Sequence, residues 1–340
     1  MRAVVITAPG GPEVLELQDR PLPAPRSGEI RVRVHAAGLN RADLLQRRGS
    51  YPAPPGWPAD VPGLEYAGTV DAVGADVPRW REGDRVMGLV GGGAQAEFLV
   101  TPAEEALPAP EGLDWPAAAA IPEAFLTAYD ALAIRGRLAV GERVLIHAVG
   151  SGVGTAAVQV ARALGAVPVG TARSAWKLER ARELGISEAI DTSRAPFREA
   201  LAAPVHVVLD VLGGPALADN LAVLEPRGRL VILGLMQGAA ASASLEPLLR
   251  RRLEIIGSVM RTRPAAERVA LAREAEARLL PWFAAPSRGG ADAPTGSPSH
   301  RAAEPPCRPV VGGVWPMEAV RSAHGALERN EVFGKAVLAW

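Results

Sequence analysis

Hydrophobic and polar positions show two different periodicities along this chain. Over residues 1–115 apolar and polar residues alternate, as where Ile30, Val32 and Val34 are separated by arginines. This period of two is typical of strands with one buried face. Gly- and Pro-rich stretches, such as residues 52–58, separate the runs. The first third of the chain is therefore predicted to be a mostly antiparallel β domain.

From about residue 120 short apolar runs alternate with segments of helical spacing. Residues 143–148 are followed by a helical pattern over 153–164, and residues 166–172 by another over 175–185. Such alternation predicts β-α-β units and a parallel sheet. After residue 264 the pattern becomes mixed, which is consistent with a return of the chain to the first domain.

One segment, residues 286–309, shows neither periodicity. It contains no Val, Leu, Ile or aromatic residue and is rich in Pro, Gly, Ser and Ala. Such a composition buries too little apolar surface to offset the entropy of ordering the segment. We expect a flexible surface insertion; a lid or a partner-binding loop is the alternative.

Charge and composition exclude several classes of function. Lys and Arg number 37, as do Asp and Glu, so the net charge does not favour nucleic acid or an anionic membrane as partner. Cys307 is the only cysteine, which excludes an intramolecular disulfide and a zinc site made of several thiolates. The sequence has neither a signal-peptide pattern nor an apolar run long enough for a membrane helix, so we expect a soluble, cytoplasmic protein.

A glycine-rich loop lies between the first predicted strand and helix of the second half. It comprises Gly150, Ser151, Gly152, Val153 and Gly154. Free N–H groups and the helix dipole at such a point favour a phosphate, and absent side chains let it approach the backbone. The G-x-G-x-G spacing leaves a tight turn under close helix packing as an alternative. Its place inside a β-α-β unit favours the pyrophosphate of a dinucleotide.

The end of the next predicted strand indicates which dinucleotide binds. An NAD site usually has an acidic residue there for the ribose 2′-hydroxyl. This chain instead has Arg173, Ser174 and Lys177, with no acid over residues 168–175. Guanidinium and ammonium groups suit a 2′-phosphate, so we predict NADPH. The alternative is two solvated charges at the start of a surface helix.

Six segments spread over nearly the whole chain resemble one enzyme family. They are HAAGLNRADLLQRRGSYP (35–52), PGLEYAGTVDAVG (62–74), GDRVMGLVGGGAQAEFLV (83–100), AAAAIPEAFLTAYDAL (117–132), HAVGSGVGTAAVQVARALGA (147–166) and GKAVL (334–338). Together they resemble the quinone oxidoreductase branch of the medium-chain dehydrogenase/reductase superfamily, above all its p53-inducible type. The resemblance does not extend to residues 286–309.

This resemblance implies an α/β fold of two domains and a homodimer. Residues 1–120 and 265–340 would form a GroES-like catalytic domain, and residues 121–264 a Rossmann domain that binds NADPH. Zinc-dependent members of the superfamily have metal ligands where this chain has Asn40 and Leu64. An amide and a leucine are not zinc ligands, so we predict an enzyme without a metal.

Without a Lewis acid, hydride transfer to an already electrophilic acceptor such as a quinone needs chiefly positioning. Asn40, Tyr51 and Ser151 are the catalytic candidates in the cleft. Each has a structural alternative: Asn40 as a turn residue, Tyr51 as an exposed cover, and Ser151 as a residue small enough for its loop. Thr127 and Lys335 are implied cofactor contacts by resemblance, although Lys335 could also be a solvated charge at the end of a strand.

Gly234 and Leu235, at the end of another predicted strand, complete the implied cofactor contacts. Two other functions remain open for this scaffold. Reduction of an enone or an enoyl thioester would need a proton donor, for which Tyr51 is suited. A non-catalytic NADPH-binding protein is the third interpretation, and a nucleic-acid role is disfavoured by the balanced charge.

Overall fold

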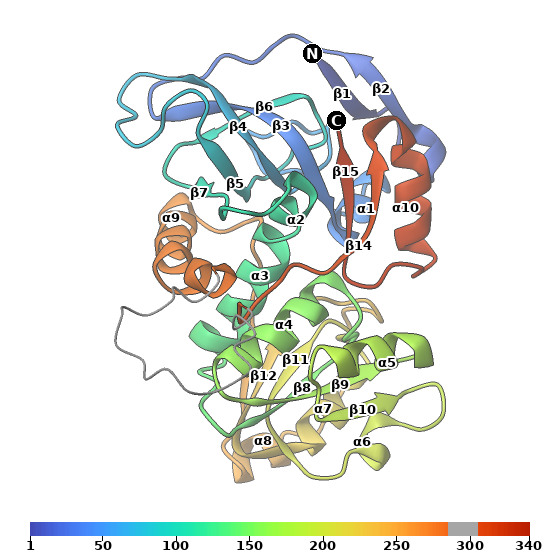
Figure 1. Cartoon of the computed structure of the whole chain (residues 1–340). Helices are drawn as coiled ribbons and strands as arrows, with labels where there is room; N and C mark the ends of the chain where they lie inside the picture. Colours follow the sequence, from blue (N-terminus) through green and yellow to red (C-terminus); the bar gives the residue numbers. More distant parts are fainter. Residues whose placement is uncertain (285–304) are drawn as a thin grey trace, which may run out of the picture.

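The computed structural model describes residues 1–284 and 305–340, and these form two lobes, each built on its own sheet (Figure 1). The predicted insertion at 286–309 lies outside the described residues except for 305–309, where Cys307 is buried. None of the described helices is long and apolar enough to cross a membrane.

The first lobe contains a seven-stranded sheet in the order β14-β15-β3-β4-β5-β7, with β6 paired to β3, and a separate hairpin of β1 and β2. All pairings are antiparallel except β14 with β15. The bounds are β1 Arg2–Ile6, β2 Leu15–Asp19, β3 Glu29–Leu39, β4 Glu65–Val73, β5 Arg85–Leu89, β6 Phe98–Pro102, β7 Leu107–Pro108, β14 Val311–Pro316 and β15 Lys335–Ala339. The predicted return of the C-terminal segment to the first sheet is therefore observed for β14 and β15.

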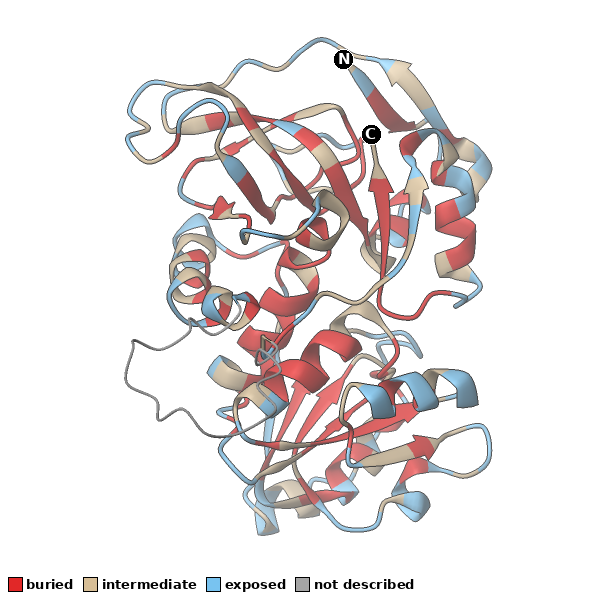
Figure 2. Cartoon of the chain, in the orientation of Figure 1, coloured by how far each residue is buried: buried red, intermediate tan, exposed pale blue. Residues whose placement is uncertain are grey.

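The second lobe is a six-stranded parallel sheet in the order β10-β9-β8-β11-β12-β13. Numbered from β8, this is the doubly wound order 3-2-1-4-5-6, which confirms the predicted Rossmann-type sheet. The bounds are β8 Arg143–Ile146, β9 Val167–Ala172, β10 Glu188–Asp191, β11 Val205–Asp210, β12 Leu224–Ile232 and β13 Glu254–Gly257. Its central strands are fully buried in Figure 2, as expected when helices cover both faces of a parallel sheet.

Helices cover these sheets and connect the lobes. α3 packs on α4 and runs between the two lobes (Figure 1). Their bounds are α1 Arg41–Arg47, α2 Trp115–Ala119, α3 Pro122–Tyr129, α4 Gly152–Ala163, α5 Ala175–Glu183, α6 Phe197–Ala200, α7 Ala216–Ala222, α8 Glu246–Arg250, α9 Ala265–Glu274 and α10 Val320–Glu328. The predicted helix ends after Leu164 and Leu184 are confirmed, because Gly165 and Gly185 follow with φ of 75° and 96°.

Three arginines after β13 fasten the chain where it passes from the second lobe back to the first. Arg263 Nη1 donates to Asp130 Oδ1 at 3.0 Å, and both side chains are almost completely buried. Arg268 donates to both carboxylate oxygens of Glu105 at 2.8 Å. Arg261 donates to backbone carbonyls of the first lobe, including Gly91 O at 2.7 Å. Of these three, Arg261 alone links residues 121–264 to the first lobe; the pairs of Arg263 and Arg268 each lie within one of the two predicted domains.

We expect Asp130→Ala to lower the free energy of unfolding by about 3–5 kcal/mol, because Arg263 would keep a buried charge without its partner. The matched control is Glu246→Ala, which removes an exposed pair with Arg250 and should change stability by about 0–1 kcal/mol. Urea unfolding followed by circular dichroism measures both. Equal effects of the two changes would show that the buried pair does not hold the structure.

Candidate active site

The glycine loop lies at the point where the order of the parallel sheet reverses, between β8 and β11. β8 ends at Ile146 and α4 begins at Gly152, as predicted. Ser151 caps the helix: its Oγ accepts a hydrogen bond from Gly154 N at 3.0 Å. Ala148 has a φ of 49°, a left-handed conformation unusual for a residue with a side chain. Such strain is typical of functional turns.

Each glycine of this loop is required by a different neighbour. A Cβ on Gly150 would lie 2.8 Å from Cδ of Lys177, and one on Gly152 would lie 2.5 Å from Cδ of Lys335. A Cβ on Gly154 would lie 2.5 Å from the carbonyl oxygen of Ala148. The first two glycines therefore admit lysine side chains beside the loop. The third permits close packing of helix on turn, so the turn alternative accounts for Gly154.

Three cations from both lobes face one another at the end of β9. Arg173 is exposed, Lys177 half-buried, and Arg41 comes from the start of α1 in the other lobe. Burial and the charge of Arg173 lower the pKa of Arg41, and burial and Arg41 lower the pKa of Lys177. No carboxylate pairs with any of the three within the described ranges; Arg41 donates to the amide oxygen of Asn330. We call Arg41, Arg173 and Lys177 the basic cluster.

The basic cluster is well suited to an anion, because its unpaired charges repel until one binds. Sequence reasoning had found Arg173 and Lys177 but missed Arg41. Its only signal was its place next to Asn40, and nothing in the sequence placed that position opposite β9. Ser174 adjoins the cluster as the cap residue of α5.

A buried ion pair lies on the other side of the glycine loop. Lys335 Nζ pairs with Glu65 Oε1, and both side chains are buried. Lys335 Nζ also donates to Asn40 Oδ1 at 2.8 Å, while Asn40 Nδ2 donates to Glu65 Oε1 at 2.8 Å. Glu65 Oε2 accepts from Glu123 N at 2.7 Å. The solvated alternative for Lys335 is therefore wrong: the lysine is buried and paired.

Asn40 caps α1 and is fixed from several directions. Its backbone N donates to Asp43 Oδ2 at 2.7 Å, and Asp43 Oδ1 accepts from Gly63 N at 3.0 Å. Burial raises the pKa of Asp43 to about 6, although these two backbone donors oppose the shift. Lys335 and Glu65, both bonded to its amide, fix the side chain of Asn40. The alternative of a turn residue does not hold, because Asn40 has an extended backbone with φ of −126° and caps a helix; its catalytic role stays a prediction.

Tyr51 is half-buried rather than an exposed cover. The guanidinium of Arg261 lies 4.9 Å from the centre of its ring, and Arg261 Nη1 donates to the carbonyl of Tyr51 at 2.9 Å. Burial raises the pKa of the Tyr51 hydroxyl, and the charge of Arg261 partly opposes this. Arg261 thus positions the ring, although it lies 210 positions farther along the chain. Sequence reasoning did not single it out.

The remaining predicted contacts lie on α3 and after β12. Thr127 Oγ1 is buried and has no hydrogen-bond partner in the part of the chain that the structure describes. Such a group normally finds a partner, so it is available to a ligand. Gly234 and Leu235 follow β12, and Leu235 is 53% exposed. The orphaned hydroxyl, the glycine loop and the basic cluster together fit a phosphorylated dinucleotide.

The zinc positions of the superfamily do not fit a metal in this chain. Leu64 offers no ligand atom, and the amide of Asn40 is bonded to Lys335 and Glu65. Among the described residues no three His, Cys, Asp or Glu side chains are grouped so as to hold a metal ion. The sequence expectation of metal-free chemistry stays a prediction with this support.

Comparison with known proteins identifies the family. A family model described as zinc-binding dehydrogenase matches residues 152–276, and one described as alcohol dehydrogenase GroES-like domain matches residues 26–111, which confirms the GroES-like prediction. The quinone oxidoreductase of Pseudomonas aeruginosa is 38% identical over 269 residues, which are 77% of this chain and 81% of that protein. This chain belongs to the quinone oxidoreductase branch of the medium-chain dehydrogenase/reductase superfamily.

Two further relatives show how much of the length of other members this chain spans. The human synaptic vesicle membrane protein VAT-1 homolog is 38% identical over 241 residues, 69% of this chain, and the match spans 61% of that protein. The solved quinone oxidoreductase of Thermus thermophilus, also determined in complex with NADPH, is 36% identical, with a TM-score of 0.81 and complete coverage of both chains. The chain thus spans less than two thirds of the VAT-1 homolog but the whole length of the bacterial enzyme.

We expect the purified protein to contain less than stoichiometric zinc and to keep its activity in a chelator, because Asn40 and Leu64 replace the ligands. Elemental analysis and an EDTA incubation measure this. Stoichiometric zinc, together with activity that the chelator removes and zinc restores, would contradict it.

Proposed function

We propose that this chain is an NADPH-dependent quinone reductase, most like the p53-inducible type of its family. The observation that carries the proposal is the basic cluster at the glycine loop: three cations without a carboxylate partner in the described chain, at the carboxyl end of a doubly wound sheet. Ligands of such sheets bind at this edge. The NADPH complex of the Thermus thermophilus relative supports the same assignment.

Different residues would bind different parts of the cofactor. Gly150, Ser151, Gly152, Val153 and Gly154 would hold the pyrophosphate with backbone N–H groups and the N-terminal end of α4. Arg173, Ser174 and Lys177 would bind the 2′-phosphate, with Arg41 closing over it from the other lobe. Thr127, Gly234 and Leu235 would border the nicotinamide. When bound, NADPH supplies the hydride.

The protein's own part in the reaction is to position the acceptor and exclude water. Lys335 and Glu65 lock the amide of Asn40, which can then donate to an acceptor oxygen or to the carboxamide of the cofactor. Tyr51 presents a flat ring, held by Arg261, against which a quinone can stack. A rigid cleft of this kind lowers the barrier chiefly by orientation.

Reduction of activated alkenes is a second candidate, favoured by one observation. Among the described residues Arg261 holds Tyr51 through its ring and its backbone carbonyl, which leaves the hydroxyl free to donate a proton. Comparing NADPH oxidation with ortho-quinones, para-quinones and enones separates the two activities. No oxidation with any acceptor would favour the third possibility, a non-catalytic NADPH-binding protein.

We also propose a homodimer. β13 is the last strand of the parallel sheet and pairs only with β12 in the described chain, and beside its free edge Ile255 and Val259 are 43% and 47% exposed. An unpaired apolar edge is usually covered. Sedimentation equilibrium should give twice the mass of the chain; a monomer at micromolar concentration would contradict this.

We expect the double variant Arg173→Ala/Lys177→Ala to lower kcat/KM for NADPH by roughly 10- to 1,000-fold and to leave NADH nearly unchanged. A hydrogen bond to a charged group contributes about 1.5–3 kcal/mol, and NADH has no phosphate at this site. Steady-state kinetics with one quinone measure both cofactors. Equal losses for NADPH and NADH would show that the phosphate binds elsewhere.

The control for this prediction is Gly152→Val. Its Cβ would displace Lys335, which cannot move freely because Glu65 and Asn40 hold it. We therefore expect it to impair NADPH and NADH equally, through the pyrophosphate that they share. A selective loss with NADPH would mean that this loop does not bind the common part of the cofactors.

A further inference from the structure

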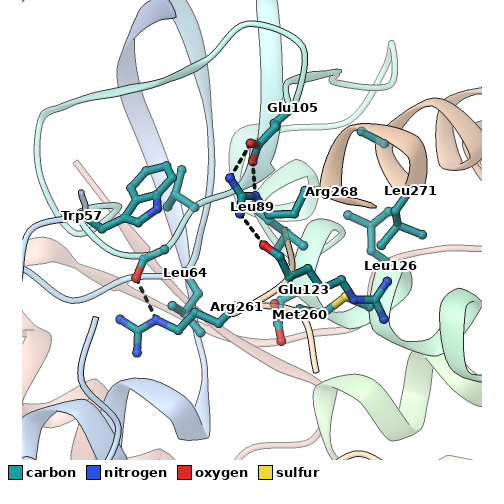
Figure 3. A pocket seen from close by; sticks show the side chains of 14 residues that line it. Trp57, Leu64, Leu89, Glu105, Glu123, Leu126, Met260, Arg261, Arg268 and Leu271 are labelled. Carbon is teal, nitrogen blue, oxygen red and sulfur yellow. Dashed lines mark hydrogen bonds and ion pairs between the residues drawn. The ribbon is translucent and has the colours of Figure 1, made fainter. Parts of the chain in front are cut away.

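A cavity lined by the first lobe, by α3 and by the segment after β13 holds one acidic side chain without an ion-pair partner in the described chain. Apolar side chains form most of its wall (Figure 3). They include Trp57, Leu64, Leu89, Leu126, Met260 and Leu271. Five charged residues also line the cavity. A charged side chain without an ion-pair partner among apolar side chains is a candidate functional residue.

Four of the five charged residues have partners. Arg268 and Glu105 form a two-pronged pair at 2.8 Å, shown by dashed lines in Figure 3. Arg263 is bonded to Asp130. Arg261 donates to two backbone carbonyls and to the amide oxygen of Gln46 at 2.6 Å.

The fifth, Glu123, has no cation within ion-pair distance anywhere in the described chain. Its backbone N is bonded to Glu65, which fixes its position in the first turn of α3. The residue as a whole is partly buried. One turn along α3, the hydroxyl of Thr127 lies close enough to the Glu123 carboxyl to act against the rise in its pKa.

Several charged and titratable groups face Glu123 from the elements around it. Glu65 of β4 and Asp43 of α1 repel its ionised form, and Lys335 of β15 opposes them. Tyr51 and Arg261 also lie within electrostatic reach of it. Burial, followed by repulsion from Glu65, raises the pKa of Glu123 to about 7. A carboxyl of this kind is still substantially protonated at neutral pH, as a general acid must be.

We propose that Glu123 is the proton donor to the acceptor, an inference that rests on the proposed reductase function. The hydride and its electron pair leave NADPH and form a new bond to the acceptor, so NADPH is oxidised to NADP⁺ and the acceptor is reduced. The O–H bond of Glu123 breaks, and its proton binds the oxygen that carries the new negative charge. Water entering the cavity then returns a proton to the carboxylate.

The chemical class of the acceptor can be inferred from the residues that line the cavity. The cavity wall is apolar, its arginines are already bonded, and a proton is delivered from a neutral carboxyl. A flat, uncharged quinone or enone fits these conditions, whereas an acceptor bearing its own carboxylate would meet Glu123 and Glu105 without a free cation to bind it.

The test is the pH dependence of kcat/KM for a para-quinone at saturating NADPH, in the wild type and in Glu123→Gln. We expect the wild-type rate to be highest below about pH 7 and to fall as the pH rises through the pKa of Glu123. Glu123→Gln should lose that dependence and fall on the order of 10²-fold at pH 6. Glu246→Gln, which changes an exposed carboxylate of α8, should keep the wild-type profile.

A wild-type profile that is flat between about pH 6 and pH 8, or an unchanged one in Glu123→Gln, would overturn the inference. NADPH binding, followed by quenching of tryptophan fluorescence, should be the same in wild type and Glu123→Gln. If the wild type oxidises no NADPH with any quinone, the reductase function itself fails. If it does and only the pH result is negative, the failure is that of Glu123 alone. Should Glu123→Gln not fold, Glu123→Asp, which keeps a carboxyl at this position, should retain a fall in rate with rising pH, and a flat profile in that variant would overturn the inference.

Discussion

The buried pair of Lys335 and Glu65 is the constraint on which the cleft depends. Glu65 receives bonds from Lys335 on β15, from Asn40 at the start of α1, and from the backbone of Glu123 at the start of α3. One carboxylate thus joins a C-terminal strand to three N-terminal elements. Removing either partner would leave a buried charge, which costs far more than the intact pair contributes. The same carboxylate occupies the space beside Gly38, where a Cβ would lie 2.2 Å from Glu65 Oε1.

Lys335 of this pair lies beside the glycine loop, and Glu65 holds the backbone of Glu123. The basic cluster lies where the phosphates of a dinucleotide would enter, and Glu123 lies in the cavity with Thr127 one turn farther along its helix. Arg261, after β13, donates to backbone carbonyls of the first lobe and so links the two lobes. The cleft therefore combines an anion site with a neutral acid, which suits the transfer of a hydride followed by a proton.

Much of this could be predicted from the sequence, because it depends on local patterns. The alternation of apolar runs with helical segments indicated the parallel sheet, and the glycines at 150–154 indicated the turn before α4. Arg173 and Lys177 follow β9 directly, so their place was visible as well. Residues held by distant parts of the chain were not visible. Arg41, Arg261 and Glu123 look like ordinary surface charges until folding brings them to the cleft.

Lys335 shows the same limit of prediction from sequence, for a residue that the sequence did single out. A lysine at the start of a strand has no pattern that distinguishes a solvated charge from a buried one. Its role depends on Glu65, which is 270 positions away in the chain. Pairing over such a distance is set by the tertiary fold, and periodicity within one segment carries no information about it.

The central claim is that the basic cluster binds a 2′-phosphate, and calorimetric titration of the wild-type protein with NADPH and with NADH tests it most directly. The account predicts that NADPH binds roughly 10- to 100-fold more tightly at low salt, since one to two powers of ten correspond to about 1.4–2.8 kcal/mol. The difference should shrink as salt screens the exposed part of the cluster. Equal dissociation constants for the two cofactors at low salt would contradict it.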